Sequence, residues 1–450
     1  MDFKKGSYWL RSGIYSMFEK FSLQIFRFGG FYMIARELAK DQAGVWFLFL
    51  AINAFVEVAR IGLIQNALMK FLASSDKSEH GKINTASLVL NVLLTSFSLI
   101  ILIVLSQIYH LFWEGLPLLD SMLFWYLLTT SILIPFFQFN FIQQGNLDFK
   151  GTFWSNFARE GLFFVYIGIC FFTSLGMEMI QMAQFQVVAA IMGSVVSYFT
   201  TKKAFFRFSR KVSMEWVKKL FNYGKYVFGT SMSSMLIKNI DKFMLAGIIG
   251  PAAVSIYEVA IKVANLVEVP TQAIAAIVFP QSAQKMEQEG KGAVKYLYER
   301  SVGIILALIV PAILFVLVFP EFVLRIVAPT YMDTVPILQV TMLFGLFIPF
   351  ARQFGTMLDS IGKPKVNFYF VILGAVLNVI FNYLFIKSFG VIGAAYGTLS
   401  TYMVIFALNQ IILYKELGVQ PLNALIYAQR FYVESVGIVV GFFKTKLSRS

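Results

Sequence analysis

The stretch that decides the fold runs from Lys202 to Lys262 and reads KKAFFRFSRKVSMEWVKKLFNYGKYVFGTSMSSMLIKNIDKFMLAGIIGPAAVSIYEVAIK. Its first part, residues 202–225, holds eight lysine and arginine side chains against one acid, Glu215. That charge density cannot cross hydrocarbon and is typical of a segment held at the cytoplasmic face of a membrane. The second part is apolar but contains charges such as Lys238 and Asp241, which inside a membrane usually face a protein interior or an aqueous cavity. The stretch therefore predicts two membrane-embedded halves around a polar centre.

The composition of the whole chain sets its class. Of its 450 residues, 58% are hydrophobic and only 14% are charged, and the mean hydropathy is +0.72. A soluble fold of this length could not bury so much apolar surface, so we expect a multi-pass membrane protein. The single cysteine, Cys170, lies in an apolar run and predicts a buried, inert thiol. His80 and His110 lack the spacing of metal ligands, so we expect no metal and no cofactor other than a coupling ion, H+ or Na+.

Apolar runs of about 20 residues, the length that crosses a bilayer, occur twelve times. Six precede the basic stretch, near residues 9–34, 43–66, 84–110, 121–143, 154–174 and 179–200. Six follow it, near residues 226–249, 253–280, 300–320, 334–358, 366–386 and 391–413. Lysine and arginine concentrate in every second loop, which places both termini in the cytoplasm. The sequence therefore predicts an all-α integral membrane protein with about 12 transmembrane helices.

The predicted spans and charges divide the chain into four parts. These are an N-terminal lobe with spans one to six (1–201), a basic cytoplasmic amphipathic linker (202–225), a C-terminal lobe with spans seven to twelve (226–415) and a cytoplasmic tail with an interfacial helix (416–450). We expect the linker to bind anionic lipid at the membrane surface rather than to dock a partner. A faint repeat lays Leu38–Phe47 on Ile248–Tyr257, two turns that each follow a polar-striped helix. It supports two related six-helix lobes around a central cavity.

Polar residues inside the spans recur at helical spacing. The first span has Ser16, Lys20, Gln24 and Arg27, the second has Asn53, Glu57 and Arg60, and later spans carry Lys238, Asp241, Glu258, Lys262 and Arg352. Stripes on the leading pair of spans in each half are what a cavity between two repeated lobes needs. The same spacing also allows a structural interpretation, in which Glu57 with Arg60, or Glu258 with Lys262, neutralise each other between helices and bind nothing.

Five pieces of the sequence carry a resemblance to a known family. They are ARELAKDQAGVW (35–46), IDKFMLAGIIGPAAVSIYEVAIKVANL (240–266), FPQSAQ (279–284), APTYMDTVPILQV (328–340) and GKPKVNFYFVILGAVLNVIFNYLFIKSFGVIGAAYGT (362–398). In order and spacing the chain resembles the Wzx-type flippases of the multidrug/oligosaccharidyl-lipid/polysaccharide exporter superfamily. Where that family often has an acid before the Gly-Leu that ends the second span, this chain has Arg60 before Ile61. A carboxylate role is therefore not carried over to that position, and the expected cavity is more cationic.

The resemblance implies a transporter and not an enzyme. It implies a flippase that moves an isoprenoid-diphosphate-linked oligosaccharide across the cytoplasmic (inner) membrane of a bacterium, by alternating access, for O-antigen, capsule or exopolysaccharide synthesis. Cationic side chains suit the diphosphate of such a substrate. The candidates for substrate binding are Arg27, Arg60, Lys238, Lys262 and Arg352. The candidates for ion coupling or charge balance are Glu57, Asp241 and Glu258.

The expected partners and two alternative functions complete this interpretation. We expect a monomer that binds the lipid-linked oligosaccharide and membrane lipids, works with a polysaccharide polymerase and glycosyltransferases, and does not bind nucleic acid. A MATE-like cation or drug antiporter is one alternative, but it would need a cavity of net negative charge. The charges of the polar stripes instead cancel or are net positive. A membrane-embedded glycosyl or acyl transferase is the other, but it would need carboxylates or histidines at a membrane face, and the outer loops are short and poor in both.

Overall fold

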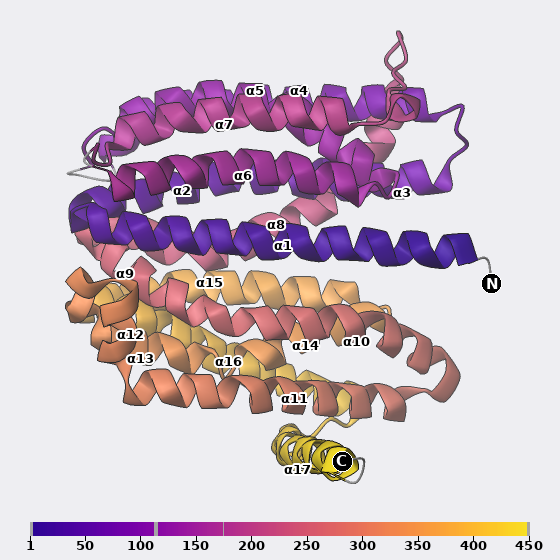
Figure 1. The fold of residues 1–450 in the computed structure, drawn as a ribbon, viewed down its shortest axis with the longest axis vertical. Coiled ribbons are helices and arrows are strands. Elements are labelled where there is room, and N and C mark those ends of the chain that lie inside the picture. Colours follow the sequence, from indigo (N-terminus) through magenta and orange to yellow (C-terminus); the bar gives the residue numbers. More distant parts are fainter. Residues whose placement is uncertain (1–2, 112–115, 174, 448–450) are drawn as a thin grey trace. The chain divides into compact units, whose positions relative to one another are not determined.

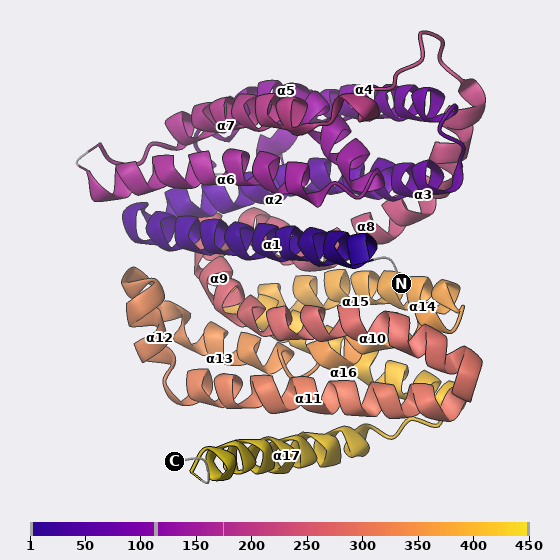
Figure 2. The ribbon, with the colours of Figure 1, turned by 45° about the vertical axis from the view of Figure 1, so that its right-hand side comes forward.

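The computed structural model describes residues 3–111, 116–173 and 175–447. In these ranges every regular element is a helix, as lipid demands of a chain that must satisfy its backbone polar groups internally. The chain divides into two compact units, Met1–Ser255 and Ile256–Ser450. Within each unit most of the long helices run side by side (Figure 1 and Figure 2), whereas α17 (Pro421–Leu447) is seen nearly end-on in Figure 1. The predicted all-α membrane fold is confirmed.

The first unit contains the elements up to the start of α9. They are α1 (Phe3–Glu37), α2 (Lys40–Arg60), the π-helical turn η1 (Ile61–Gln65), α3 (Asn66–Ser74), α4 (His80–Ile108), η2 (Tyr109–Leu111), α5 (Leu119–Gly145), α6 (Phe149–Phe172), α7 (Met179–Thr200), η3 (Lys203–Phe205) and α8 (Met214–Ile248). Helix α9 (Pro251–Ala264) crosses from the first unit into the second. The buried core of the first unit includes Leu68, Ile83, Phe141 and Leu220, so α3, α4, α5 and α8 pack around one apolar centre.

The second unit contains the elements after α9. They are η4 (Asn265–Val267), α10 (Glu268–Glu289), α11 (Lys291–Val318), α12 (Pro320–Val327), η5 (Pro329–Thr334), α13 (Val335–Phe344), α14 (Ile348–Ser360), α15 (Pro364–Phe389), α16 (Val391–Leu417) and α17 (Pro421–Leu447). The predicted tenth span is α13 and α14, which are separated by residues 345–347. The predicted eighth span is likewise interrupted, by η4 between α9 and α10.

Each of the twelve predicted spans corresponds to a helix or to two consecutive helices. Eight stretches among the described residues are long and apolar enough to cross a membrane. The other four predicted spans are α1, α6, α8 and the α9–α10 pair, whose charged and polar residues lower the local hydropathy. Polar side chains of interest occur in these four spans, and also in the apolar second span, which holds Glu57 and Arg60.

The linker differs from the amphipathic element that the sequence predicts for residues 202–225. Residues 206–213 are not helical, and they lie along the start of α4, where the Ser209 N–H donates to the Gly81 carbonyl (3.1 Å) and the Asn84 amide donates to the Arg207 carbonyl (3.0 Å). From Met214 onward the chain is already α8. Because α4 supplies partners for the linker's backbone groups, the linker does not need helical hydrogen bonds of its own.

Helix α8 packs tightly against the second predicted span. A Cβ atom added at Gly224 would lie 1.8 Å from the Leu63 carbonyl oxygen in η1, so only glycine permits this approach. A second close approach joins the two turns that the faint sequence repeat aligns, because a Cβ added at Gly44 would lie 1.8 Å from the Pro251 carbonyl oxygen. The sequence assigned α8 to the C-terminal lobe, whereas the chain as folded groups it with the first unit. The predicted lobe boundaries stay a prediction.

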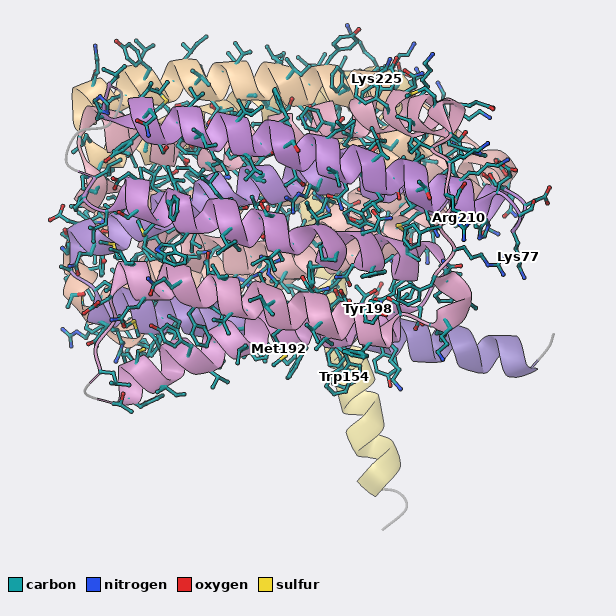
Figure 3. The ribbon with its side chains drawn as sticks, turned by 90° about the horizontal axis from the view of Figure 1, so that it is seen from above. Lys77, Trp154, Met192, Tyr198, Arg210 and Lys225 are labelled. Carbon is teal, nitrogen blue, oxygen red and sulfur yellow. The ribbon has the colours of Figure 1, made fainter. Side chains whose placement is uncertain are left out.

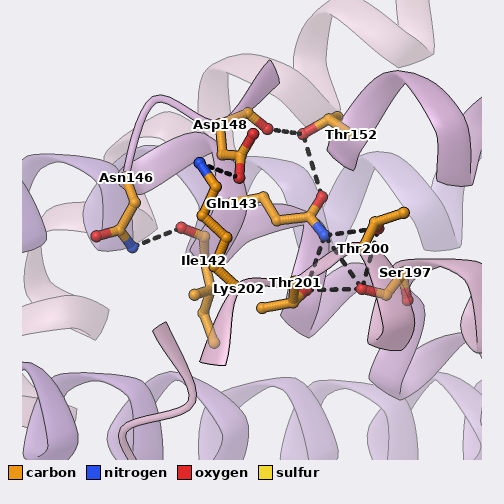
Figure 4. A network of polar contacts seen from close by, with 9 residues as sticks. All are labelled: Ile142, Gln143, Asn146, Asp148, Thr152, Ser197, Thr200, Thr201 and Lys202. Carbon is orange, nitrogen blue, oxygen red and sulfur yellow. Dashed lines mark hydrogen bonds and ion pairs between the residues drawn. The ribbon is translucent and has the colours of Figure 1, made fainter. Parts of the chain in front are cut away.

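A buried polar network ties α5, α6 and α7 together beside the start of the linker (Figure 4). The Gln143 amide donates to the Thr201 hydroxyl (2.7 Å), the Thr200 hydroxyl (3.1 Å) and the Ser197 carbonyl (3.1 Å). The Lys202 ammonium pairs with Asp148 at 2.9 Å. These contacts fix the end of α7, and with it the point from which the linker departs.

The tail after the twelfth predicted span forms α17, which packs on α11. The Asn423 amide donates to Glu299 (3.0 Å), and the Tyr432 hydroxyl donates to the Ala307 carbonyl. Gly303 makes the approach close, since a Cβ there would lie 2.6 Å from the Ala424 carbonyl oxygen. In Figure 3 the far part of α17, drawn in yellow, extends away from the other helices of its unit. Its predicted position at the membrane interface stays a prediction.

Candidate functional site

Arg60 is a buried cation at the end of α2. Its side chain has 0% exposure, and one terminal nitrogen donates to both the carbonyl and the hydroxyl oxygen of Thr130 on α5, each at 2.7 Å. The guanidinium also lies 5.2 Å from the centre of the Phe137 ring. Its Nε and its other terminal nitrogen have no hydrogen-bond partner among the described residues. A buried charge with two unused donors is costly, and it is suited to receive an anion or a polar ligand.

The local backbone explains why Arg60 points into the protein. Directly after it the chain winds as the π-helical turn η1, which widens the helix by one residue per turn. Such turns are rare and often occur at functional sites. A Cβ atom added at Gly62 would meet α8 at 3.0 Å from the Phe228 Cα and 3.1 Å from the Ser231 hydroxyl. The end of the second predicted span is thus held against α8 while Arg60 turns toward α5.

Two ion pairs lie on α1, α2 and α6. Arg159 on α6 pairs with Glu57 on α2, and their side chains are 18% and 23% exposed. Arg27 on α1 lies 3.6 Å from Glu160 on α6. The Arg159 guanidinium also lies 5.2 Å from the Phe136 ring. Arg27, Glu57 and Arg60, which the sequence analysis singled out, all occur in this unit together with two charged residues of α6.

The pair between Glu57 and Arg60 that the structural interpretation suggested does not form. Glu57 binds Arg159 instead, and Arg60 binds Thr130. The reason is directional: although Glu57 and Arg60 are three residues apart on α2, one side chain faces α6 and the other faces α5. That interpretation was wrong for this pair.

Sequence reasoning missed Asn156, Arg159 and Glu160 on α6. The Asn156 amide donates to Glu19 on α1 at 2.9 Å, so all three residues join α6 to α1 or α2. The signal was present, since the three positions are spaced i, i+3 and i+4 within a predicted span. It could have been found by treating the fifth span in the same way as the first and second.

On α8 the candidates Lys238 and Asp241 differ in exposure. Lys238 is exposed, whereas Asp241 is 4% exposed and one of its oxygens accepts the Lys242 N–H at 3.0 Å. The structure thus places Asp241 within the packing of α8 and Lys238 at its surface.

The remaining candidates lie in the second unit. Glu258 and Lys262 face each other on α9 at 3.5 Å, and Glu258 is 4% exposed. This is the pairing that the structural interpretation gave for them. Arg352 is an exposed residue of α14. The structure thus gathers Arg27, Arg60 and Glu57 within one unit and places Lys262, Glu258 and Arg352 within the other.

The charge of the cluster in the first unit leans positive. The guanidiniums of Arg27, Arg60 and Arg159 are accompanied by the carboxylates of Glu57 and Glu160. Arg159 and Arg27 are each paired, so the unneutralised cation is the buried one, Arg60. A cluster with this balance favours an anionic ligand over a cationic one.

The sequence of this chain matches a family model and several known proteins. The family model described as "Polysaccharide biosynthesis protein" matches residues 33–335. A curated relative, the probable low-salt glycan biosynthesis flippase Agl15 of Haloferax volcanii, is 24% identical over 381 residues, which are 84% of this chain and 78% of that protein. An uncharacterized membrane protein of Methanocaldococcus jannaschii is 29% identical over 241 residues, 52% of this chain. That match spans 48% of the relative, or about half its length.

Two solved structures have a similar fold. An inward-facing MATE family transporter of the MOP superfamily superposes with a TM-score of 0.74 at 17% identity, covering 87% of this chain and 95% of that one. The lipid II flippase MurJ in an inward closed conformation gives a TM-score of 0.73 at 14% identity, covering 95% and 92%. These likenesses show the fold. The family model and the relative named as a glycan flippase, taken with this fold, confirm the resemblance stated from the sequence. Because the family model spans well over half of the 450 residues, the chain belongs to the polysaccharide biosynthesis protein family.

Proposed function

We propose that this protein is a flippase that moves an isoprenoid-diphosphate-linked oligosaccharide across the cytoplasmic membrane. Family membership and the relative named as a glycan flippase support a transporter rather than an enzyme. The head group of such a lipid is large, polar and anionic, and each polar group that enters hydrocarbon without a hydrogen bond costs several kcal/mol. A protein that offers polar and cationic contacts along the way removes this barrier.

The observation that carries the proposal is the environment of Arg60. It is fully buried, and two of its three nitrogens have no hydrogen-bond partner among the described residues. A diphosphate oxygen would supply the hydrogen-bond acceptor that the free nitrogens of Arg60 lack, because arginine binds phosphate through two parallel N–H donors. Arg27, Lys238, Lys262 and Arg352 are proposed as further contacts for the diphosphate or for acidic sugars.

The finer parts of the proposal concern energy and context. Glu57, Asp241 and Glu258 are proposed to balance charge or to couple transport to H+ or Na+, with the protein alternating between inward-open and outward-open states. The oligosaccharide would be a repeat unit of O-antigen, capsule or exopolysaccharide, supplied by glycosyltransferases and taken up by a polymerase. We further propose that the protein acts as a monomer in the cytoplasmic membrane of a bacterium; the curated relatives reported above are archaeal.

The test uses purified protein in proteoliposomes that contain a fluorescent isoprenoid-diphosphate oligosaccharide. Arg60→Met keeps the buried volume but removes the charge, and a buried ion replaced by an apolar group of similar volume often leaves stability unchanged. We expect normal thermal stability and a fall in flipping of at least about tenfold, the effect of losing one charge-assisted hydrogen bond of about 1.5–3 kcal/mol. Arg60→Lys should retain part of the activity, because it keeps the charge but not the fork of donors.

The matched control is Arg325→Met. This arginine is exposed and pairs only loosely with Glu321, at 3.9 Å, so the variant should flip at the normal rate. Full activity of Arg60→Met would refute the role proposed for Arg60. Transport of organic cations, with no movement of the lipid-linked sugar, would instead favour the antiporter, for which the likeness to a MATE family fold is the supporting observation.

A further inference from the structure

An open groove lies between α4 and α8 in the first unit, and its lining includes none of the charged residues of the cluster described above. Its volume is about 390 Å³. Apolar side chains form its walls, among them Leu90, Leu93 and Phe97 on α4 and Phe221 on α8. Leu93 and Phe97 are 58% and 60% exposed. In a membrane protein, walls this apolar and this open face the acyl chains of the bilayer.

Two contacts fix α8 against its neighbours on either side of the groove. Toward the linker, the Trp216 indole N–H on α8 donates to Glu79, the residue before α4, at 2.8 Å. Farther along α8, Gly224 rests on the Leu63 carbonyl of η1, where no side chain would fit. Four residues between these two fixed points line the groove: Val217, Lys218, Phe221 and Asn222. The groove is therefore formed by the packing of the helices and does not depend on the rotamer of one side chain.

The polar residues of the groove lining lie on its α8 side, which we call the cationic end. Lys218 and Asn222 line it, one helical turn apart on α8. No ion pair or hydrogen bond of the Lys218 ammonium occurs within the described part of the chain. The Lys225 ammonium donates to the Asn222 side-chain oxygen at 3.2 Å, which adds a second cation and leaves the Asn222 N–H2 group as a donor. Lys77, Arg210 and Lys225 lie toward the same end of the helices in Figure 3.

We propose that this groove binds an anionic phospholipid, with one acyl chain along α4 and the phosphate at Lys218 and Asn222. The wall from Leu90 to Phe97 is about 10 Å long at 1.5 Å per residue, which is about two thirds of one leaflet of a hydrocarbon core about 30 Å thick. The charge of the polar end is complementary to phosphate, and lysine near a membrane surface favours anionic lipid. A zwitterionic lipid offers the same acyl chain without the net charge, so the site discriminates by head group.

The neighbouring Lys219 provides a matched control. Its ammonium pairs with Glu215 at 2.6 Å and lies 4.6 Å from the centre of the Trp216 ring. It therefore carries the same charge as Lys218 at the adjacent position, but it is already partnered and does not line the groove. A second control concerns shape: Val92 is 42% exposed on α4 and lies next to Leu93, outside the groove lining.

The experiment is native mass spectrometry of the detergent-purified protein, titrated with phosphatidylglycerol and, separately, with phosphatidylcholine. We expect preferential retention of phosphatidylglycerol, weakened about fivefold by Lys218→Gln, since one surface lysine contributes about that factor toward anionic lipid. Lys219→Gln should change retention by less than about twofold. Leu93→Trp should fill the groove and reduce retention, whereas Val92→Trp should not.

Several outcomes would overturn the proposal. Equal retention of the two lipids would mean that the cationic end does not select a head group. Unchanged retention in both Lys218→Gln and Leu93→Trp would place the lipid elsewhere. Displacement of phosphatidylglycerol by inorganic phosphate would mean that the acyl chain contributes nothing. If Leu93→Trp left phosphatidylglycerol retention intact but abolished flipping of the lipid-linked sugar, the groove would serve the transported lipid, and that result would leave the proposed flippase function standing.

Discussion

Arg159 on α6 donates a hydrogen bond to Glu57 on α2, although the two residues are 102 positions apart in the chain. Arg60, only three positions after Glu57, binds Thr130 on α5 instead. The charged residues of the second predicted span are thus divided between two neighbouring helices. This division leaves the Glu57 carboxylate neutralised and the Arg60 guanidinium without a carboxylate partner among the described residues.

The first prediction is that mutational rescue follows this pairing. Arg159→Ala leaves a partly buried carboxylate unpaired and should lower the free energy of unfolding by about 1.5–3 kcal/mol. Adding Glu57→Ala should recover part of that loss, whereas Glu57→Ala and Arg60→Ala should be nearly additive. Thermal unfolding of the purified single and double mutants measures both cycles. A stronger coupling between Glu57 and Arg60 than between Glu57 and Arg159 would contradict the observed geometry.

The second prediction concerns the packing of α8 on η1. Gly224→Ala would put a methyl group 1.8 Å from the Leu63 carbonyl oxygen, so the helices must separate, and we expect a loss of about 1–3 kcal/mol. Gly292→Ala is the control, because a Cβ there meets nothing within 4 Å and alanine favours the helix α11. Chemical or thermal unfolding in detergent distinguishes the two. Equal stability of both variants would argue against the close approach.

The third prediction concerns the network around Gln143. Gln143→Leu removes the donor shared by Ser197, Thr200 and Thr201 and leaves buried acceptors unsatisfied, which should cost about 1–3 kcal/mol. Gln181→Leu makes the same chemical change at an exposed site, where the amide bonds to Glu178 and to no other described residue, and should be close to neutral. Comparison of the two melting temperatures tests this. No difference between them would show that the network does not hold α5 and α7 together.

The fourth prediction concerns pH. Glu79, in the loop before α4, accepts hydrogen bonds from Lys82 and Trp216, and these bonds hold its pKa below the ordinary value of 4.5. A carboxyl with a lowered pKa stabilises the fold above its unfolded pKa, and the contribution is lost as the pH falls through the folded pKa. We therefore expect faster amide exchange of residues 206–213 only below about pH 4.5.

Trp216→Phe tests the origin of that effect. It removes one of the two donors, so the increase in amide exchange should begin at a higher pH than in the unmodified protein. Glu321→Gln, an exposed carboxylate of α12, should leave the pH profile of residues 206–213 unchanged. A profile that does not move in Trp216→Phe would exclude the indole as a determinant of the Glu79 pKa.

The fifth prediction concerns orientation. Cys170 is buried, so the native thiol should not react and single cysteines can be introduced without removing it. Replacements of Lys77 and Lys211 should be shielded from an impermeant thiol reagent in intact cells, because basic loops stay in the cytoplasm. Replacements of Leu175 and Asp333, both exposed, should react. Labelling of Lys211→Cys from outside would reverse the predicted orientation.

The sequence by itself determined where the long helices lie, but not the breaks in the predicted eighth and tenth spans. A segment that crosses lipid must satisfy its backbone hydrogen bonds within itself, so a span can be recognised from its own residues. The same is true of the polar stripes that contain Arg27 and Glu57, because helical periodicity is a local property. Even Asn156, Arg159 and Glu160 were recognisable from their spacing in the fifth span.

Only the tertiary structure decided which of these residues meet. The partner of Glu57 depends on which helix packs against each face of α2, and no local pattern encodes that choice. The path of the linker was decided in the same way: its backbone groups are satisfied by α4, a helix more than a hundred residues earlier in the chain. Contacts between distant segments are set by the packing of whole helix faces, and this is why Arg60 could be named as a candidate from the sequence while its unpaired, buried state could not.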